Sequence, residues 1–123
     1  MYVLEHYKLD YNKGFDKSSA KQSGTWDNAT KHKADVVLAG GDKINYFNIT
    51  DWGVGKWWEV NTKSYAYVHS VRIRNRYTNA IALGADRLGD TEVYVDQTLC
   101  GKVQSNTVQN TWYHVKFDKP VYG

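Results

Sequence analysis

The sequence predicts an all-β protein built from short antiparallel strands. Three segments alternate apolar with polar residues, namely Val71-Arg72-Ile73-Arg74, Val93-Tyr94-Val95 and Val115-Lys116-Phe117, as strands with one buried face do. Aromatic residues make up 15% of the chain, with ten Tyr and five Trp, which favours a β-rich core over a Leu-rich helical one. No long stretch has helical periodicity, although Ala29 to Leu38 can hold a short helical turn. The alternation predicts one core lined by Val71, Ile73, Val93, Val95, Val115 and Phe117.

Size and charge narrow the classes of function. The 123 residues fit a single domain, expected over residues 15–123 after an N-terminal segment at 1–14. The net charge of +3 comes from 16 basic and 13 acidic residues spread along the chain, without the basic stripe that binds a phosphate backbone. No apolar window is long enough to cross a bilayer. We therefore expect neither a nucleic-acid partner nor a membrane span.

Several motifs occur in an order known from one group of lectins. A tryptophan doublet, two alternating strands and a Leu-Cys-Gly turn follow one another as Lys56-Trp57-Trp58-Glu59-Val60-Asn61, Ser70 to Arg76, Asp86 to Val95 and Leu99-Cys100-Gly101. Upstream stands Ala20-Lys21-Gln22-Ser23-Gly24-Thr25, and downstream Tyr113 to Gly123. This order resembles the carbohydrate-binding F-type lectins (fucolectins), and more broadly the discoidin or coagulation-factor C-domain superfamily. The resemblance implies an antiparallel, jelly-roll-like β-sandwich of the galactose-binding-domain-like type, in which the doublet begins a strand with one ring toward the core.

The resemblance also implies how the chain ends. In related domains the segment that aligns with Pro120-Val121-Tyr122-Gly123 forms a turn, and one or two further strands follow it. Those strands are lacking here. A sheet without its last strand has an open edge that recruits another chain. Alternatively, the N-terminal Tyr2-Val3-Leu4 and Tyr7-Lys8-Leu9 fill the gap.

The single cysteine and two glycosylation sequons are informative about the compartment in which the protein is found. Cys100 has no partner for a disulfide within the chain. In the resembling family this Cys pairs with one that aligns here with Phe117, so we expect a buried free thiol packed near Phe117. Asn28 and Asn48 begin Asn-x-Thr sequons. If the sequons are glycosylated, the protein is extracellular or lies on the cell surface.

A saccharide site follows only from the resemblance. The sugar of F-type lectins sits between loops at one end of the sandwich, held by a His and by two basic residues that align with Arg76 and Arg87. Arginine forks donate in-plane hydrogen bonds to adjacent ring hydroxyls, and Trp52 or Tyr46 would stack on a neutral saccharide. The family's His is absent near Ile49.

Calcium is a second expectation of the resemblance. In F-type lectins Ca²⁺ staples the first long loop, and the matching region keeps Asp42 and Asn45 but inserts Lys43. Hard cations need several oxygen ligands from one locality. Asp42 and Asn45 are therefore the expected ligands of a weak site.

Two functions compete, and catalysis is not expected. The carboxylates of Asp86, Asp90 and Glu92 lack neighbours that would split their pKa values into acid and base roles. The first function is non-catalytic carbohydrate binding. The alternative is a structural or assembly subunit of a larger complex with a vestigial sugar pocket, which docks on other protein chains through its open sheet edge and the loop at 77–86.

Overall fold

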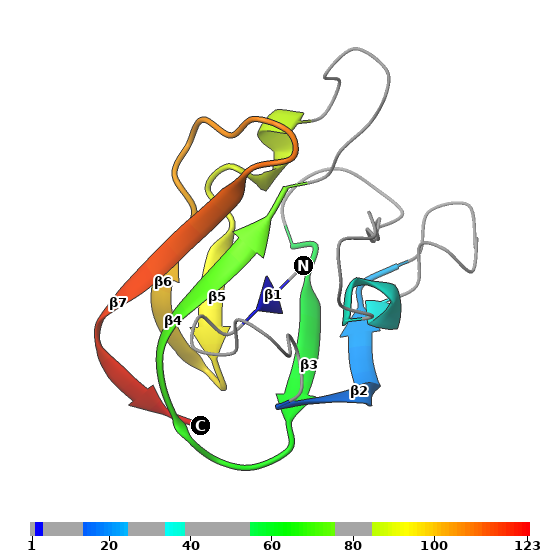
Figure 1. The fold of residues 1–123 in the computed structure, drawn as a ribbon, viewed down its shortest axis with the longest axis vertical. Helices are drawn as coiled ribbons and strands as arrows, with labels where there is room; N and C mark the ends of the chain where they lie inside the picture. The colour runs from blue at the N-terminus through cyan, green and yellow to red at the C-terminus, as the bar shows by residue number, and fades with distance from the viewer. Residues whose placement is uncertain (1, 4–13, 25–33, 39–54, 76–84) are drawn as a thin grey trace. The chain divides into compact units, whose positions relative to one another are not determined.

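The described part of the protein is built from antiparallel β-strands (Figure 1). The computed structural model describes residues 2–3, 14–24, 34–38, 55–75 and 85–123. Two short 3₁₀ helices are the only helical elements within these ranges. The predicted all-β character is therefore confirmed. The chain divides into two compact units, of which one holds β2, η3 and β3 and the other holds β1 and every element from β4 onward.

The first unit is a two-stranded sheet with a helical turn against it. Strand β2 (Phe15–Gln22) pairs with β3 (Trp58–Thr62), and the turn η3 (Ala34–Leu38) contacts β2. The turn falls within the segment where the sequence predicted one. The tryptophan doublet begins β3 as expected, and the half-buried ring of Trp58 donates its indole N–H to the Ala34 carbonyl over 2.8 Å. Burial of Leu38, only 1% exposed, anchors the turn.

A bulge in β2 explains why the polar residues Lys17, Ser18 and Ser19 lie at the centre of this strand. The register slips between Asp16 and Lys21, so backbone groups there lose their ladder partners. Side chains replace them: Ser19 Oγ accepts from the Asn61 amide over 2.8 Å, and Asp16 Oδ1 accepts from the Ser18 amide over 3.1 Å. Short hydroxyl and carboxylate side chains suit such local bonds.

The second unit contains a three-stranded sheet and a hairpin. The sheet has the order β1-β4-β7, and the hairpin joins β5 to β6 after the 3₁₀ turn η4. The bounds are β1 Tyr2–Val3, β4 Tyr67–Arg74, β7 Trp112–Tyr122, β5 Glu92–Val95, β6 Thr98–Lys102 and η4 Ala85–Leu88. Tyr2 and Val3 pair with Ile73 and Arg72. The N-terminal segment thus supplies an edge strand, which is the role that the sequence left open for it.

The expected turn at Pro120–Gly123 is wrong, because β7 continues through it. After Lys116 pairs with Ser70, the register skips to Val121 opposite Val68 and Tyr122 opposite Tyr67. Four residues of β7 thus lie opposite the single residue His69. Pro120 occupies this irregularity, where a missing backbone N–H breaks no ladder bond.

The Leu99-Cys100-Gly101 turn is also wrong, because these residues lie inside β6. The hairpin turns at Asp96 and Gln97 instead, and Asp96 adopts a left-handed φ of 52°, which short polar residues tolerate. The register slips after Val93 pairs with Gly101 and resumes with Tyr94 opposite Leu99. Cys100 is therefore the extra residue of a β-bulge.

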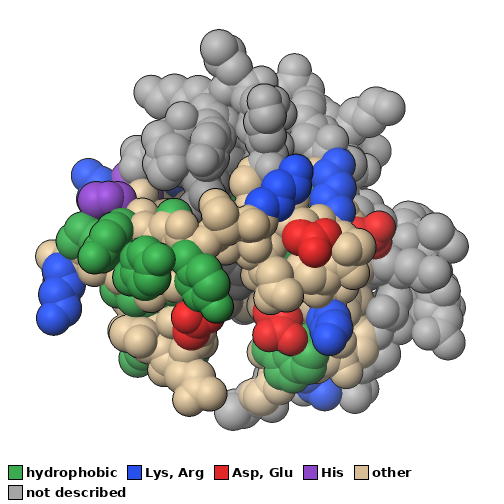
Figure 2. All heavy atoms as spheres, turned by 90° about the horizontal axis from the view of Figure 1, so that it is seen from below, with side chains coloured by type: hydrophobic (Ala, Val, Ile, Leu, Met, Phe, Trp, Pro, Cys, Tyr) green, Lys and Arg blue, Asp and Glu red, His purple; other side chains and the backbone are tan. Residues whose placement is uncertain are grey.

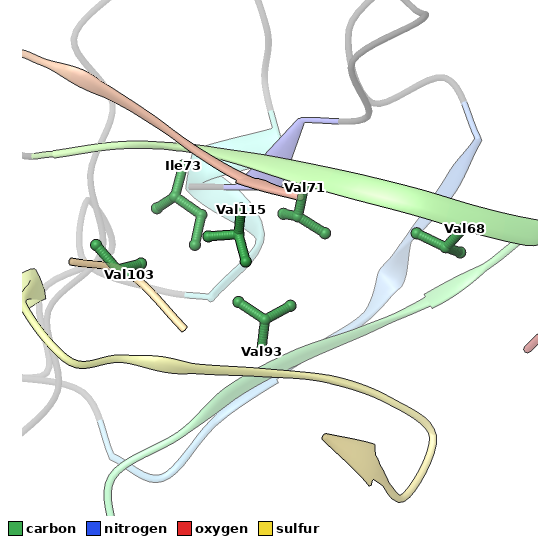
Figure 3. Close-up of a cluster of buried hydrophobic side chains, with 6 residues drawn as sticks. All are labelled: Val68, Val71, Ile73, Val93, Val103 and Val115. Atoms are coloured by element: carbon green, nitrogen blue, oxygen red, sulfur yellow. The ribbon is translucent and has the colours of Figure 1, made fainter. Parts of the chain in front are cut away.

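Valine side chains of the sheet and the hairpin meet in one hydrophobic cluster (Figure 3). Its most buried members are Ile73 and Val103, which are 2% and 1% exposed. All six residues predicted from strand alternation belong to this core, with Val95 and Phe117 only partly buried at its margin. The predicted inward parity of the strands is confirmed. The cluster comprises Val68, Val71, Ile73, Val93, Val103 and Val115.

Cys100 is free, as expected, but half-buried rather than buried. Gly101 takes the core-facing position, since a Cβ built on it would meet Val115 Cγ1 at 2.8 Å. The Cys100 thiol instead donates to the Thr98 carbonyl over 3.2 Å.

We expect a thiol reagent such as DTNB to label Cys100 in the native protein to completion, more slowly than in denaturant. Partial exposure gives the reagent access without unfolding, whereas the local bond slows attack. Absorbance at the thionitrobenzoate band measures both rates. Labelling that requires global unfolding would contradict this position.

Candidate functional site

Most of the residues predicted to form a site lie outside the described residues. This holds for Arg76, Trp52 and Tyr46 of the saccharide site, for Asp42 and Asn45 of the calcium site, and for the sequon residues Asn28 and Asn48. Arg87 is described, and its side chain is exposed in η4. The predicted pairing of Arg76 with Arg87 therefore lies outside the described residues, and these assignments stay predictions.

Three tyrosines form an exposed aromatic cluster where β4 begins and β7 ends. Tyr65, Tyr67 and Tyr122 are 74%, 64% and 59% exposed. The rings of Tyr65 and Tyr122 stack with centroids 5.9 Å apart at 16°, and Tyr67 tilts against Tyr122 at 5.0 Å. Figure 2 views the protein from this end of β4 and β7, and hydrophobic side chains (green) lie next to one another on that face. We call these three residues the tyrosine cluster.

Backbone pairing holds the tyrosine cluster in place. Tyr67 lies directly opposite Tyr122 in the ladder, which puts their side chains on one face. Ala66 and Gly123 exchange two backbone hydrogen bonds of 3.0 and 3.1 Å just beyond this pair. Stacked aromatic pairs add about 0.5–1.5 kcal/mol beyond burial. The rings are therefore preorganised while most of their surface faces solvent.

A shallow depression lies next to the tyrosine cluster along the ladder. Its volume is about 380 Å³, and the register slip in β7 creates it. Polar and charged groups line most of it, drawn from His69, Ser70, Lys116, Phe117, Asp118, Lys119 and Pro120. His69 lies within β4 with an exposed side chain.

The cluster and the depression together suit a ligand with apolar faces and polar edges. Aromatic rings offer flat surfaces for C–H groups, and tyrosine hydroxyls add a donor and an acceptor at the ring edge. The neighbouring Lys119 and Asp118 supply one donor group and one acceptor group of opposite charge. Such a surface can orient a polyhydroxylated ring without catalysing a reaction on it.

The described carboxylates nearest to one another are engaged separately. Asp90 Oδ1 accepts from Ser105 Oγ over 3.0 Å, and Glu92 Oε2 accepts from the Tyr94 hydroxyl over 2.7 Å. The hydrogen bond to Glu92 raises the pKa of Tyr94 above its ordinary value of 10.0, since it favours the protonated phenol.

Within the described ranges, no three His, Cys, Asp or Glu side chains gather as a metal site requires. The same ranges contain no helix that is both long and apolar enough to cross a membrane.

Sequence reasoning missed the tyrosine cluster, although a signal was present. Tyr65-Ala66-Tyr67 places two aromatic rings at alternate positions, which is the spacing of one face of a strand. Tyr122 was assigned to a turn, so its pairing with Tyr67 was not anticipated. Long-range register, which the sequence does not display, brings the third ring into place.

Comparison of the chain with protein-family models, with curated proteins and with solved structures found no match in any of the three. The resemblance to F-type lectins therefore stays a prediction. The tyrosine cluster, the depression beside it and the charges along the β4–β7 ladder are the features from which a function has to be inferred.

Proposed function

We propose that the chain is a non-catalytic carbohydrate-binding module with the jelly-roll-like β-sandwich of galactose-binding-like domains. The exposed tyrosine cluster carries this proposal. Solvent-facing tyrosines at these exposures cost hydrophobic free energy unless a ligand covers them. A saccharide ring covers such a surface with its C–H face and meets polar groups with its hydroxyls.

The sandwich part of the proposal is supported by the packing of the second unit. The hairpin β5–β6 contributes Val93, and Val103 follows it, to the same core as Val71, Ile73 and Val115 of the sheet. Two antiparallel sheets that share one core by their inner faces are the elementary form of a sandwich. Arg76 and Arg87 remain expected ligands of a separate loop site.

The described carboxylates are not arranged to hydrolyse a glycosidic bond. Hydrolysis of a glycosidic bond needs two carboxyl groups with divided acid and base roles. Asp90 and Glu92 each accept a hydrogen bond from a different neighbour, Ser105 and Tyr94. Neither lies among the residues that line the depression.

The test is a glycan array followed by calorimetry with the best ligand. Tyr122→Ala should weaken binding about tenfold or more, equivalent to ~1.4 kcal/mol, because Tyr122 contacts both other rings. Tyr94→Ala is the matched control, since Tyr94 is 54% exposed but lies on β5 and has no ring contact with the tyrosine cluster among the described aromatic pairs. An array without any bound glycan, or equal affinities of the two variants, would refute the proposal.

An assembly role is the second candidate function. Tyr94 and Leu99 lie opposite each other on the hairpin, and they are 54% and 55% exposed. Paired exposed apolar side chains are typical of protein contact surfaces. Light scattering coupled to size-exclusion chromatography separates the two functions, because an assembly subunit should lose self-association in Leu99→Ser while glycan binding is unaffected.

A further inference from the structure

The outward face of the β4–β7 ladder has a chemical character of its own. Val71 opposite Val115 and Ile73 opposite Tyr113 face the core. The pairs that alternate with them have the opposite parity, because neighbours in a strand point to opposite faces. They are Arg72 with His114, Arg74 with Trp112 and Ser70 with Lys116, and of these residues Ser70 is itself buried, at 8% exposed.

Two arginines are held over one indole ring on this face. The guanidinium carbons of Arg72 and Arg74 lie 5.2 and 5.9 Å from the centroid of the Trp112 ring, within the range of cation–π attraction. Arg74 Nε also donates to Asn110 Oδ1 over 3.1 Å, and its Nη2 donates to the same oxygen. Arg72, Arg74 and Trp112 are half-buried. We call these three residues the arginine–tryptophan array.

At the six described β4–β7 positions with this parity, the array offers donors without a matching carboxylate. These six positions hold Lys116, Arg72 and Arg74 but no Asp or Glu. Asn110 accepts hydrogen bonds from two N–H groups of Arg74, whereas a guanidinium has five N–H groups that can donate. Planar donor forks fit the oxygens of a carboxylate or sulfate in a bidentate manner. An anionic group therefore complements this face.

The array and the tyrosine cluster lie along the same ladder. Tyr67 pairs with Tyr122 at one end and Arg74 with Trp112 at the other, with the depression between them. The eight residues of β4 span about 23 Å at ~3.3 Å per step. This length accommodates a chain of several sugar rings rather than one.

We propose that the outward face of the β4–β7 ladder binds an acidic saccharide chain. A carboxylate or sulfate lies against Arg72 and Arg74, and a sugar ring lies against the tyrosine cluster. This inference rests on the proposed carbohydrate-binding function and changes its ligand class from a neutral to an acidic saccharide.

The spacing of charge disfavours a nucleic-acid duplex. The stretch from Ser70 to Arg74 holds three cations over about 13 Å. A duplex carries one phosphate per ~1.7 Å, about eight over this length, which three cations leave mostly unpaired. A single strand carries one per ~3.4 Å, about four over this length, which the three cations nearly match, so a single-stranded oligonucleotide is a competing probe in the test. Trp112 is also covered by the guanidinium groups, so its ring is not open to a stacking base.

The test compares matched ligands by calorimetry at about 50 and about 300 mM NaCl. The probes are an oligogalacturonate, its fully methyl-esterified neutral form, and a sulfated galactan oligosaccharide of the same length. The free acid or the sulfated chain should bind about tenfold or more tightly than the ester at low salt, and the salt should reduce that preference. Which of the two binds more tightly identifies the anionic group.

Variants show whether the arginine–tryptophan array causes the preference for the acidic chain. The double variant Arg72→Gln, Arg74→Gln should lose the preference for the acidic chain while its affinity for the ester stays within about twofold. Arg72→Gln alone, which leaves the Arg74 bonds to Asn110 in place, should lose part of it. The control Lys63→Gln, Lys102→Gln removes two exposed charges elsewhere and should keep the preference. Melting curves show whether each variant is folded.

The outcomes separate this inference from the proposed function. Binding of the ester that depends on Tyr122 but shows no acidic preference overturns the inference and leaves the carbohydrate function standing. No binding of any of the three probes overturns the inference, and an empty glycan array overturns the proposed function as well. Equal loss of preference in the lysine control, or tighter binding of a single-stranded oligonucleotide than of the acidic saccharides, also overturns the inference.

Discussion

Ile73→Ala should lower the free energy of unfolding by about 2–5 kcal/mol, the usual cost of truncating a buried isoleucine. Ile73 is 2% exposed and belongs to the valine cluster between the sheet and the hairpin. Its backbone pairs with Tyr2 on one side and Tyr113 on the other, so the chain around it cannot collapse easily into the vacated space. Urea titration followed by tryptophan fluorescence measures the change.

Two control variants show that the loss comes from core packing. Ile73→Val removes one methylene and should cost about 0.5–1.5 kcal/mol. Leu99→Ala, at a side chain that is 55% exposed, should change stability by no more than about 0.5 kcal/mol. An Ile73→Ala protein as stable as the Ile73→Val protein would contradict the position of Ile73 in the core. Arg72 and Arg74 point away from the core, so saccharide binding should survive in Ile73→Val.

The sequence predicted the centre of this core because local alternation is enough to identify it. Val71, Ile73 and Val115 sit in uninterrupted ladder segments, where parity read from the sequence equals parity in the sheet. Val68 is buried too, although it lies at an even position and Val71 and Ile73 at odd ones. The register slip between Val68 and Ser70 reverses which alternate residues of β4 face the core. A slip of this kind cannot be recognised in the sequence of one strand, because it depends on the pairing with the other strand.

Both misplaced turns have the same physical origin. Both turns came from the resemblance to F-type lectins, and glycine and proline, the strongest local signals for a turn, stand at Gly101 and Pro120. In the folded chain Gly101 allows close approach to Val115, and Pro120 sits in the irregular part of β7. Pairing across the sheet overrides the local preference, since bulges admit both residues inside a strand.

The candidate surface was less predictable than the core. Tyr65 and Tyr122, like Arg74 and Trp112, are far apart in the sequence and meet only through the pairing of β4 with β7. Each residue taken alone is an ordinary strand residue. The loop residues favoured by the resemblance, such as Arg76 and Trp52, lie outside the described residues, so the two sets are independent hypotheses that mutagenesis can rank.

Gly101→Ala should destabilise the protein by about 1–3 kcal/mol, as overpacking of a close-fitting core does. At an unconstrained position the same change stabilises a protein by about 0.4–1 kcal/mol, because it restricts the unfolded chain. At Gly101 the new Cβ would meet Val115 Cγ1 at 2.8 Å. Valine is stiff about χ1, so relief requires the hairpin to move away from β7. Chemical denaturation measures the loss.

A double-mutant cycle tests whether that one contact is the cause. Val115→Ala alone leaves a cavity, since Val115 is 5% exposed, and it also removes the methyl group that blocks a Cβ at position 101. The double variant Gly101→Ala, Val115→Ala should therefore be more stable than the sum of the single changes implies, by about 0.5–3 kcal/mol. Gly55→Ala is the matched control: its cost comes from a φ of 86°, with no atom within 4 Å of the added Cβ, so it should be additive with Val115→Ala. Additivity of the Gly101 pair would mean that the hairpin does not pack on β7 through this contact.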